Sequence, residues 1–221
     1  MDINEALYTT RAMRRVRPDP IPEPVQARIL DAAIRAPTGG NAQGWRFMLV
    51  DDPQLKAQLG PLYRSALNQL FDTLYKPQAD AAAANPETET SQSFDKMHRS
   101  AFHLAENFEA YPLLLFAFDI ADPTGASIFP AVWNAMLAAR AEGVGSALTS
   151  VLLFRLGETL ELLGVPQDEG WRMSCCVTFG YPTGRWGVAP RRPVHEVSFR
   201  NGWNQPLGLE IPEPLWPPSG D

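Results

Sequence analysis

The sequence predicts one domain-like core built from α-helices and buried β-strands. Segments with apolar residues at helical spacing are interspersed with short, continuous apolar runs of the strand type. The chain shows neither an internal repeat nor a second core. Its 221 residues, 45% of them hydrophobic and 20% charged, have the composition of an ordinary globular protein.

Six segments are predicted as helices from their apolar spacing and from the capping or breaking residues at their ends. They are residues 2–10, 25–36, 54–74, 94–110, 129–142 and 155–164. Pro37 ends the second of them, because proline has no N–H to donate to the helix. For the same reason we expect Pro61 to break or kink the third.

Strands are predicted where the apolar run is short and bounded by turn residues. Residues 47–50 follow a glycine-containing loop, and residues 173–179 end at Gly180. The run 113–118 is apolar throughout, which is typical of a strand buried on both faces. Residues 194–199 alternate in polarity and form a further candidate strand.

Two segments are predicted to lie outside the core. Residues 76–92 contain few large apolar side chains, so we expect an exposed, mobile excursion, either a lid over a site or a plain surface insertion. The tail 201–221 is rich in proline but carries Trp203 and Trp216 as large apolar anchors. Such a tail either wraps its own domain or lies across a partner. The main domain is therefore predicted over residues 1–200.

Charge and cysteine content limit the classes of function. The net charge of −6 and the pI of about 5.1 argue against a general nucleic-acid-binding surface. No apolar run approaches the ~20 residues that span a bilayer, and the N-terminus lacks a signal-peptide pattern. Cys175 and Cys176 are adjacent in an apolar run, as expected for reduced thiols of a cytoplasmic protein.

The loop at residues 37–44 is a candidate ligand site. It joins a predicted helix to a predicted strand, and Gly39 and Gly40 leave room for the backbone to approach a ligand closely. Asn41 and Gln43 each carry an amide that both donates and accepts hydrogen bonds. A planar ligand with polar edges would suit such a loop.

Arginines are concentrated near both ends of this acidic chain. One group comprises Arg11, Arg14, Arg15 and Arg17, and Arg191 and Arg192 form a second pair. Most charge runs are simply solvated basic faces. The alternative is a clamp for a small anion, because guanidinium groups match phosphate oxygens bidentately.

Motifs for side-chain catalysis are absent from the sequence. Residues 143–148 begin like a dinucleotide-binding turn but lack the third glycine and follow a predicted helix, where a strand is required. The three histidines have no metal-ligand spacing, and no Gly-x-Ser-x-Gly elbow occurs. We therefore expect no metal site and no catalytic side chain.

Four stretches of the chain, in order, resemble the nitroreductase family of FMN-dependent oxidoreductases. They are TRAMRRVRPDPIP at 10–22, APTGGNAQGWRF at 36–47, NAMLAARAEGVGS at 134–146, and GYP at 180–182 followed by RRPVHEV at 191–197. Each motif is weak to moderate by itself, and together they cover the chain from end to end. The chain departs from the family pattern at Thr10, Ala12 and Gly44, where many relatives have arginine, serine and proline respectively.

The resemblance implies an α+β fold with a central mixed, mainly antiparallel sheet flanked by helices. It also implies an intertwined homodimer with two FMN sites at the interface, each built from both chains. The C-terminal extension would cross to the partner, where Trp203 and Trp216 would anchor it.

The resemblance also implies which residues contact FMN. Arginines from both ends of the chain would hold the phosphate, loop residues from the other subunit would meet the ring system, and backbone groups after the glycine turn would lie near its reactive edge. The expected contacts are Arg11, Ala12, Arg14, Arg15, Pro37, Thr38, Gly39, Asn41, Gln43, Thr149, Ser150, Arg191 and Arg192. Either His103 or Asn107 is a candidate for the pyrimidine edge.

In function, the resemblance implies reduction of nitroaromatic, quinone or other electron-poor small molecules with NAD(P)H by a ping-pong cycle, with the chemistry carried by FMN. One alternative is a related flavoenzyme that acts as a dehydrogenase, removes halogen or fragments its own flavin. The other is a flavin-binding protein without catalytic activity.

Overall fold

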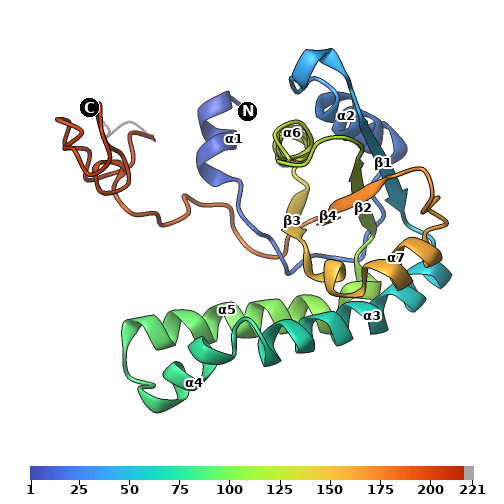
Figure 1. Ribbon diagram of the computed structural model, residues 1–221, viewed down its shortest axis with the longest axis horizontal. Helices are drawn as coiled ribbons and strands as arrows, with labels where there is room; N and C mark the ends of the chain where they lie inside the picture. The colour runs from blue at the N-terminus through green and yellow to red at the C-terminus, as the bar shows by residue number, and fades with distance from the viewer. Residues whose placement is uncertain (217–221) are drawn as a thin grey trace. The chain divides into compact units, whose positions relative to one another are not determined.

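The computed structural model describes residues 1–216, which form two compact units (Figure 1). The larger unit comprises Ala12–Gly184, and the smaller one combines Met1–Arg11 with the chain from Arg185 onward. The predicted extension 201–221 falls in the smaller unit. Its last part, 217–221 with Pro217 and Pro218, lies outside the described residues.

A four-stranded sheet in the order β1-β2-β4-β3 forms the centre of the larger unit. Its strands are β1 (Trp45–Val50), β2 (Leu113–Asp119), β3 (Gly145–Thr149) and β4 (Arg172–Gly180). All neighbouring pairs are antiparallel, and an isolated parallel bridge joins Ala12 to Ser146 of β3. The expected antiparallel character of the sheet is confirmed.

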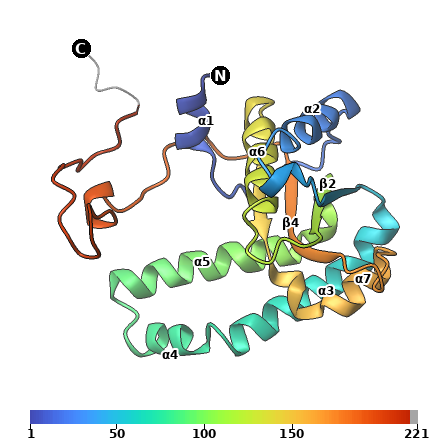
Figure 2. The same ribbon diagram turned by 45° about the horizontal axis from the view of Figure 1, so that its top comes forward.

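Helices cover both faces of this sheet (Figures 1 and 2). One face packs against α2 (Glu23–Ala33) and α6 (Ile128–Ala141), and the other against α3 (Pro53–Asp72), α5 (Glu89–Glu106) and α7 (Leu156–Leu162). The side chains of β2 alternate between the two cores, with Leu115 on the α6 side and Phe116 on the α3 side. No residue of β2 is more than 5% exposed, which confirms the prediction of a strand buried on both faces.

The break predicted at Pro61 is absent, because α3 continues through this residue from Pro53 to Asp72. The proline removes one backbone hydrogen bond of the helix. On either side of it, Leu59 and Tyr63 are almost fully buried in the core. Apolar packing of this face therefore holds the helix together across the missing bond.

The segment 76–92 is largely helical. Lys76–Ala84 forms α4, and α5 begins at Glu89, with the Thr88 side chain accepting a hydrogen bond from the Ser91 N–H as its N-terminal cap. Most of its side chains are exposed, as expected, and only Ala82 and Ser91 are buried. In Figures 1 and 2, α4 lies at the far end of the paired helices α3 and α5.

One strand was missed and one predicted strand was wrong. Residues 145–149, for which no strand was predicted, form β3, because their backbone pairs with β4 from Gly145↔Gly180 to Thr149↔Cys176. Residues 194–199 contain no strand. Val194–Glu196 forms the 3₁₀ helix η4, with the Glu196 N–H bonded to the Pro193 carbonyl, because the segment pairs with none of the described strands.

The smaller unit contains α1 (Ile3–Thr9) and long irregular segments. The Asp2 side chain caps α1 by accepting a hydrogen bond from the Glu5 N–H at 2.8 Å. The Trp216 ring lies 5.7 Å from that of Tyr8, and the Trp203 ring lies 5.1 Å from that of Phe199. Trp203 is nevertheless 83% exposed, so it is not an anchor within its own chain.

Candidate functional site

The segment that carries Arg14 and Arg15 is fixed to the core of the larger unit through its backbone. The Met13 N–H donates to the Ser146 carbonyl at 2.9 Å, and the Arg15 carbonyl accepts from the Thr183 N–H at 3.0 Å. The Arg14 carbonyl accepts a hydrogen bond from the Tyr111 hydroxyl at 2.6 Å. Met13, Arg14 and Arg15 are therefore held by three different parts of the larger unit: β3, the residues just before β2 and the chain after β4.

Two glycines allow this segment to lie so close to the strands. A Cβ atom on Gly145 would lie 2.8 Å from the Met13 Cβ, and one on Gly180 would lie 2.7 Å from the Val16 Cβ. Such separations are shorter than real side-chain carbons tolerate. Gly145 and Gly180 therefore make room for the arginine-bearing segment.

A cavity of about 370 Å³ lies beside this segment. Arg14 and Arg15 line it together with His103 and Asn107 of the α5 end and with Tyr111. Within the described chain, the Arg14 guanidinium donates to Ser100 Oγ at 3.1 Å, and the Arg15 side chain has no hydrogen-bond or ion-pair partner. His103 and Asn107, the two candidates for contact with the pyrimidine edge, thus line the same cavity as Arg14 and Arg15.

Thr149 and Ser150 lie where β3 ends and the 3₁₀ helix η3 (Val151–Arg155) begins. Thr149 is buried and Ser150 is exposed. The Thr149 Oγ1 atom is 2.9 Å from the Tyr63 hydroxyl and accepts a hydrogen bond from the Val151 N–H at 3.3 Å. This turn is therefore tied to α3 through one side-chain hydroxyl.

Tyr63 and Tyr111 are the residues of this region that the sequence did not single out. Burial raises the pKa of Tyr63 to about 12, although its hydrogen bond to Thr149 acts in the opposite direction. Burial likewise raises the pKa of Tyr111 far above that of a free tyrosine. Both hydroxyls therefore stay protonated at physiological pH. Neither tyrosine lies in a recognisable motif, so no sequence signal pointed to it.

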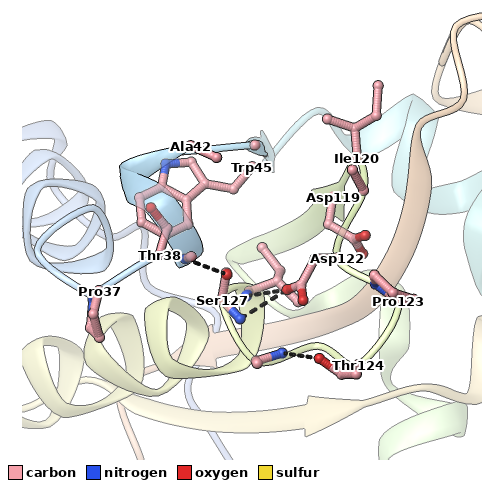
Figure 3. A pocket seen from close by; sticks show the side chains of 15 residues that line it. Pro37, Thr38, Ala42, Trp45, Asp119, Ile120, Asp122, Pro123, Thr124 and Ser127 are labelled. Carbon is pink, nitrogen blue, oxygen red and sulfur yellow. Dashed lines mark hydrogen bonds between the residues drawn. The ribbon is translucent and has the colours of Figure 1, made fainter.

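The loop at 37–44 lines a different cavity, of about 420 Å³ (Figure 3). Pro37, Thr38 and Trp45 form one side of it, and the connection from Asp119 to Ile128 forms the other. None of the residues around Arg14 and Arg15 lines this cavity. The larger unit thus places Arg14 and Arg15 in one cavity and Pro37, Thr38 and Gly39 in another. The other predicted contacts of this unit line neither of the two: Ala12, Asn41, Gln43, Thr149 and Ser150.

The far wall of this cavity is fixed by Asp122. Its carboxylate accepts hydrogen bonds from the Ser127 and Ile128 N–H groups, each at 2.9 Å, at the start of α6. Burial acts to raise the pKa of Asp122, but these backbone hydrogen bonds outweigh it and hold the pKa below the ordinary value. Asp122 therefore remains an anion whose hydrogen bonds already serve the fold.

Left-handed backbone distinguishes the loop from the arginine segment. Gly40, Asn41 and Gln43 have φ angles of 58°, 54° and 50°, and all three residues are exposed. The loop bonds mainly to itself, with Gln43 Nε2 donating to Asn41 Oδ1 at 3.2 Å and the Gln43 N–H to Thr38 Oγ1 at 3.2 Å. Positive φ is unfavourable for a side chain such as glutamine, so the loop stores strain at exposed polar residues.

The remaining predicted contacts belong to the smaller unit. The Arg11 guanidinium donates to the Arg185 carbonyl at 2.9 Å, and Arg191 donates to the carbonyl of its neighbour Pro190. Arg191 and Arg192 line a cavity of about 730 Å³ with Tyr8 and Thr10. Ala12, the first residue of the larger unit, is held by its bridge to Ser146.

Two further observations concern residues 1–216 alone. None of the helices in this part of the chain is both long and apolar enough to cross a membrane. In the same residues, His, Cys, Asp and Glu side chains form no group of three that is placed to hold a metal ion.

Comparison with known proteins gives a family match over most of the chain. Residues 7–181 match the model described as "Nitroreductase family". The 5,6-dimethylbenzimidazole synthase of Rhodobacter capsulatus is 29% identical over 222 residues, covering 94% of this chain and 93% of that protein. The iodotyrosine deiodinase of Thermotoga neapolitana is 27% identical over 199 residues, covering 90% of this chain and 95% of that protein.

Solved structures share the fold. An iodotyrosine deiodinase bound to FMN and 3-iodo-L-tyrosine superposes with a TM-score of 0.67 at 22% identity, covering 90% of this chain and 98% of that one. The FMN-dependent nitroreductase NfnB from Mycobacterium smegmatis, in complex with NADPH, gives a TM-score of 0.65 at 19% identity and covers 90% and 97% of the two chains.

Proposed function

The chain belongs to the nitroreductase family, and we propose that it is an FMN-dependent oxidoreductase that uses NAD(P)H to reduce nitroaromatic, quinone or other electron-poor small molecules. The observation that carries this proposal is the cavity shared by Arg14, Arg15, His103 and Asn107. Guanidinium groups suit the anionic parts of FMN, and an imidazole and an amide suit the polar edge of its ring system.

The residues present fit FMN in their chemistry and in their rigidity. The cavity lies within the size range of small-molecule sites, and the arginine-bearing backbone beside it is held by hydrogen bonds to β3, to the residues just before β2 and to the chain after β4. A preorganised cationic segment loses little freedom when an anion binds. When bound, FMN would supply the redox chemistry, accepting hydride from NAD(P)H and passing electrons to the acceptor.

We assign the protein's own residues to binding and orientation. The FMN phosphate would be held by arginines from both ends of the chain, namely Arg11, Arg14 or Arg15, and Arg191 or Arg192. The backbone of Ala12 belongs to the same segment, and the turn at Thr149 and Ser150 would offer backbone donors near the reactive edge. Pro37, Thr38, Gly39, Asn41 and Gln43 would contact the flavin that the other subunit holds.

A homodimer is part of this proposal for two reasons. Within one chain, the loop at 37–44 lines one cavity, and Arg14 and Arg15 line another. A site that contains both the loop and these arginines would therefore need a second chain. In addition, α6 leaves Phe129 and Trp133, one turn apart, 43% and 39% exposed. Large exposed apolar side chains on one helix face are typical of a protein–protein interface.

Anaerobic titration with NADH and with NADPH tests the function. The purified protein is expected to bind FMN, and its flavin absorbance should bleach with at least one nucleotide and return when a quinone or nitroaromatic acceptor is added. Protein that binds FMN but does not bleach would be a flavin-binding protein without this activity. Protein that binds no FMN on reconstitution would contradict the proposal altogether.

The dimer is tested with Trp133→Glu, which places a charge on the exposed face of α6. The variant should sediment as a monomer and lose FMN, whereas Phe154→Leu, at a half-buried position on η3, serves as a control that keeps the apolar character of its site. A monomeric Trp133→Glu protein that retains FMN at wild-type affinity would show that one chain suffices for the site.

A second candidate is a flavoenzyme of the same fold with different chemistry. The relatives that align over nine-tenths or more of this chain include a 5,6-dimethylbenzimidazole synthase and an iodotyrosine deiodinase. Incubation of the reduced holoprotein with 3-iodo-L-tyrosine, or with oxygen followed by analysis of the flavin, separates these activities. Release of iodide, or loss of intact FMN, would favour this candidate.

A further inference from the structure

Two buried tyrosines join the core of the larger unit to two of the three segments that we assign to FMN in that unit, the arginine segment and the turn after β3. Tyr63 of α3 is 3% exposed, and Tyr111, just before β2, is 1% exposed. Both belong to the core on the α3 side of the sheet. Each has a hydroxyl that bonds to a residue outside its own element.

Tyr111 fixes the backbone of Arg14. Its hydroxyl donates to the Arg14 carbonyl at 2.6 Å, across 97 residues of sequence. At the other end of the same residue, the Tyr111 carbonyl accepts a hydrogen bond from the Lys56 ammonium at 2.8 Å, and Lys56 is itself buried. Tyr111 is thus held in place by α3 and in turn holds the arginine segment.

Tyr63 fixes the turn after β3. Its hydroxyl lies 2.9 Å from Thr149 Oγ1, which also accepts from the Val151 N–H across Ser150. The Tyr63 ring is stacked on Phe108, with 4.4 Å between the ring centroids. Packing of the ring therefore positions the hydroxyl, and the hydroxyl positions the turn.

Packing alone does not account for these hydroxyl groups. Phenylalanine would fill nearly the same space, and a buried hydroxyl is costly unless it is hydrogen-bonded. Both hydroxyls form hydrogen bonds with segments that carry predicted FMN contacts. Removing either one would leave the core filled but would free a site segment to move.

We propose that Tyr63 and Tyr111 are positioning residues of the FMN site, Tyr63 through the Thr149–Val151 turn and Tyr111 through the Arg14 backbone. The proposal rests on the proposed function, since it assumes that these segments contact FMN. In this proposal neither tyrosine contacts FMN itself. Their hydroxyls hold the Thr149–Val151 turn and the Arg14 backbone in the positions from which these segments contact FMN.

The experiment compares Tyr63→Phe, Tyr111→Phe and Tyr75→Phe as purified dimers. Tyr75 is a matched control, because it packs in the same core cluster while its hydroxyl has no hydrogen bond to any described residue. Dissociation constants for FMN are measured well below the unfolding temperature of each variant. Loss of either positioning hydroxyl should raise the constant about three- to tenfold, and Tyr75→Phe should leave it unchanged.

Variants of Thr149 separate positioning from general stability. Thr149→Val should reproduce the Tyr63→Phe effect, the double variant should add little to it, and Thr149→Ser should restore wild-type binding. The midpoint potential of the bound flavin should become more negative in Tyr63→Phe, because loosened backbone donors stabilise the reduced anion less. A change in stability alone would not move this potential.

Two results would overturn the positioning role while leaving the proposed function intact. One is that Tyr63→Phe and Tyr111→Phe both keep the wild-type FMN affinity and flavin potential. The other is that Tyr75→Phe changes them as much as these two variants do. Should Tyr63→Phe fail to fold, Thr149→Val tests the same hydrogen bond. A wild-type protein that binds no FMN would overturn both proposals.

Discussion

Two segments of the larger unit that carry predicted contacts, the arginine segment and the loop at 37–44, are held in opposite ways. Residues 13–17 form hydrogen bonds with four other positions of the larger unit: Ser146, Tyr111, Tyr181 and Thr183. The loop at 38–43 is exposed, bonds mainly to itself and contains two non-glycine residues with positive φ. The first segment is preorganised by its own chain, whereas the second would gain its contacts from a ligand or a partner.

The largest expected effect concerns the buried tyrosine Tyr63, and it is a loss of folding stability at alkaline pH. Burial raises the pKa of Tyr63 to about 12, so the folded protein keeps the phenol neutral while the unfolded chain ionises near pH 10. The stabilisation by Tyr63 is complete below pH 10 and is lost as the pH rises toward 12.

Urea unfolding of wild type and Tyr63→Phe between about pH 9 and about pH 11.5 measures this loss. As the pH rises through this range, wild type should lose unfolding free energy relative to Tyr63→Phe. The relative loss should reach up to about 2–3 kcal/mol once Tyr63 is ionised in both states. Parallel curves for the two proteins would mean that the Tyr63 hydroxyl is not held as the structure has it.

A methyl group at Gly180 should disturb the preorganised segment directly. Gly180→Ala places a Cβ 2.7 Å from the Val16 Cβ and 3.2 Å from the Pro112 Cδ. Overpacking of this kind costs about 1–3 kcal/mol, and displacement of Val16 moves Arg14 and Arg15 with it. Thermal unfolding and FMN titration should both show the change.

Gly157 supplies the control for that substitution. It lies in α7, and nothing is within 4 Å of the place that a methyl carbon would take. Gly157→Ala should therefore keep FMN affinity and raise stability by about 0.5–1 kcal/mol. Comparable losses in both variants would contradict a specific contact between Gly180 and the arginine segment.

The smallest expected effect tests the strained loop. Gln43→Gly and Asn41→Gly both remove the hydrogen bond between these two side chains, and both place glycine at a positive φ. Asparagine tolerates this conformation better than glutamine. Gln43→Gly should therefore be the more stable variant, by about 0.5 kcal/mol, in chemical denaturation. Equal stabilities would show that the loop is unstrained at Gln43.

Sequence reasoning located most of the elements and the family. The β2 run could be predicted because every residue from Leu113 to Phe118 is apolar, and the structure buries each of them. The arginine segment and the polar loop, on which the resemblance depends, both lie within the residues that match the family model. Local composition and motif order are properties of the chain itself, so they are visible without coordinates.

The two errors in the strand prediction have one physical cause, which is pairing between distant residues. Gly145–Thr149 is short and contains glycine, serine and alanine, and it becomes β3 only because β4 lies beside it. Residues 194–199 alternate as a strand should, yet they have no neighbouring strand among the described residues. Hydrogen bonds of a sheet join residues far apart in the chain, so a single segment does not determine them.

The sequence by itself determined three of the four strands, the family and the residues that we propose for FMN. Only the tertiary structure decided which hydroxyls and glycines meet these segments: Tyr63 and Tyr111 bond to them, and Gly145 and Gly180 admit the arginine segment. These roles depend on contacts across 86 and 97 residues for the tyrosines, and on approaches of 2.8 and 2.7 Å for the glycines. Such contacts exist only once the chain has folded.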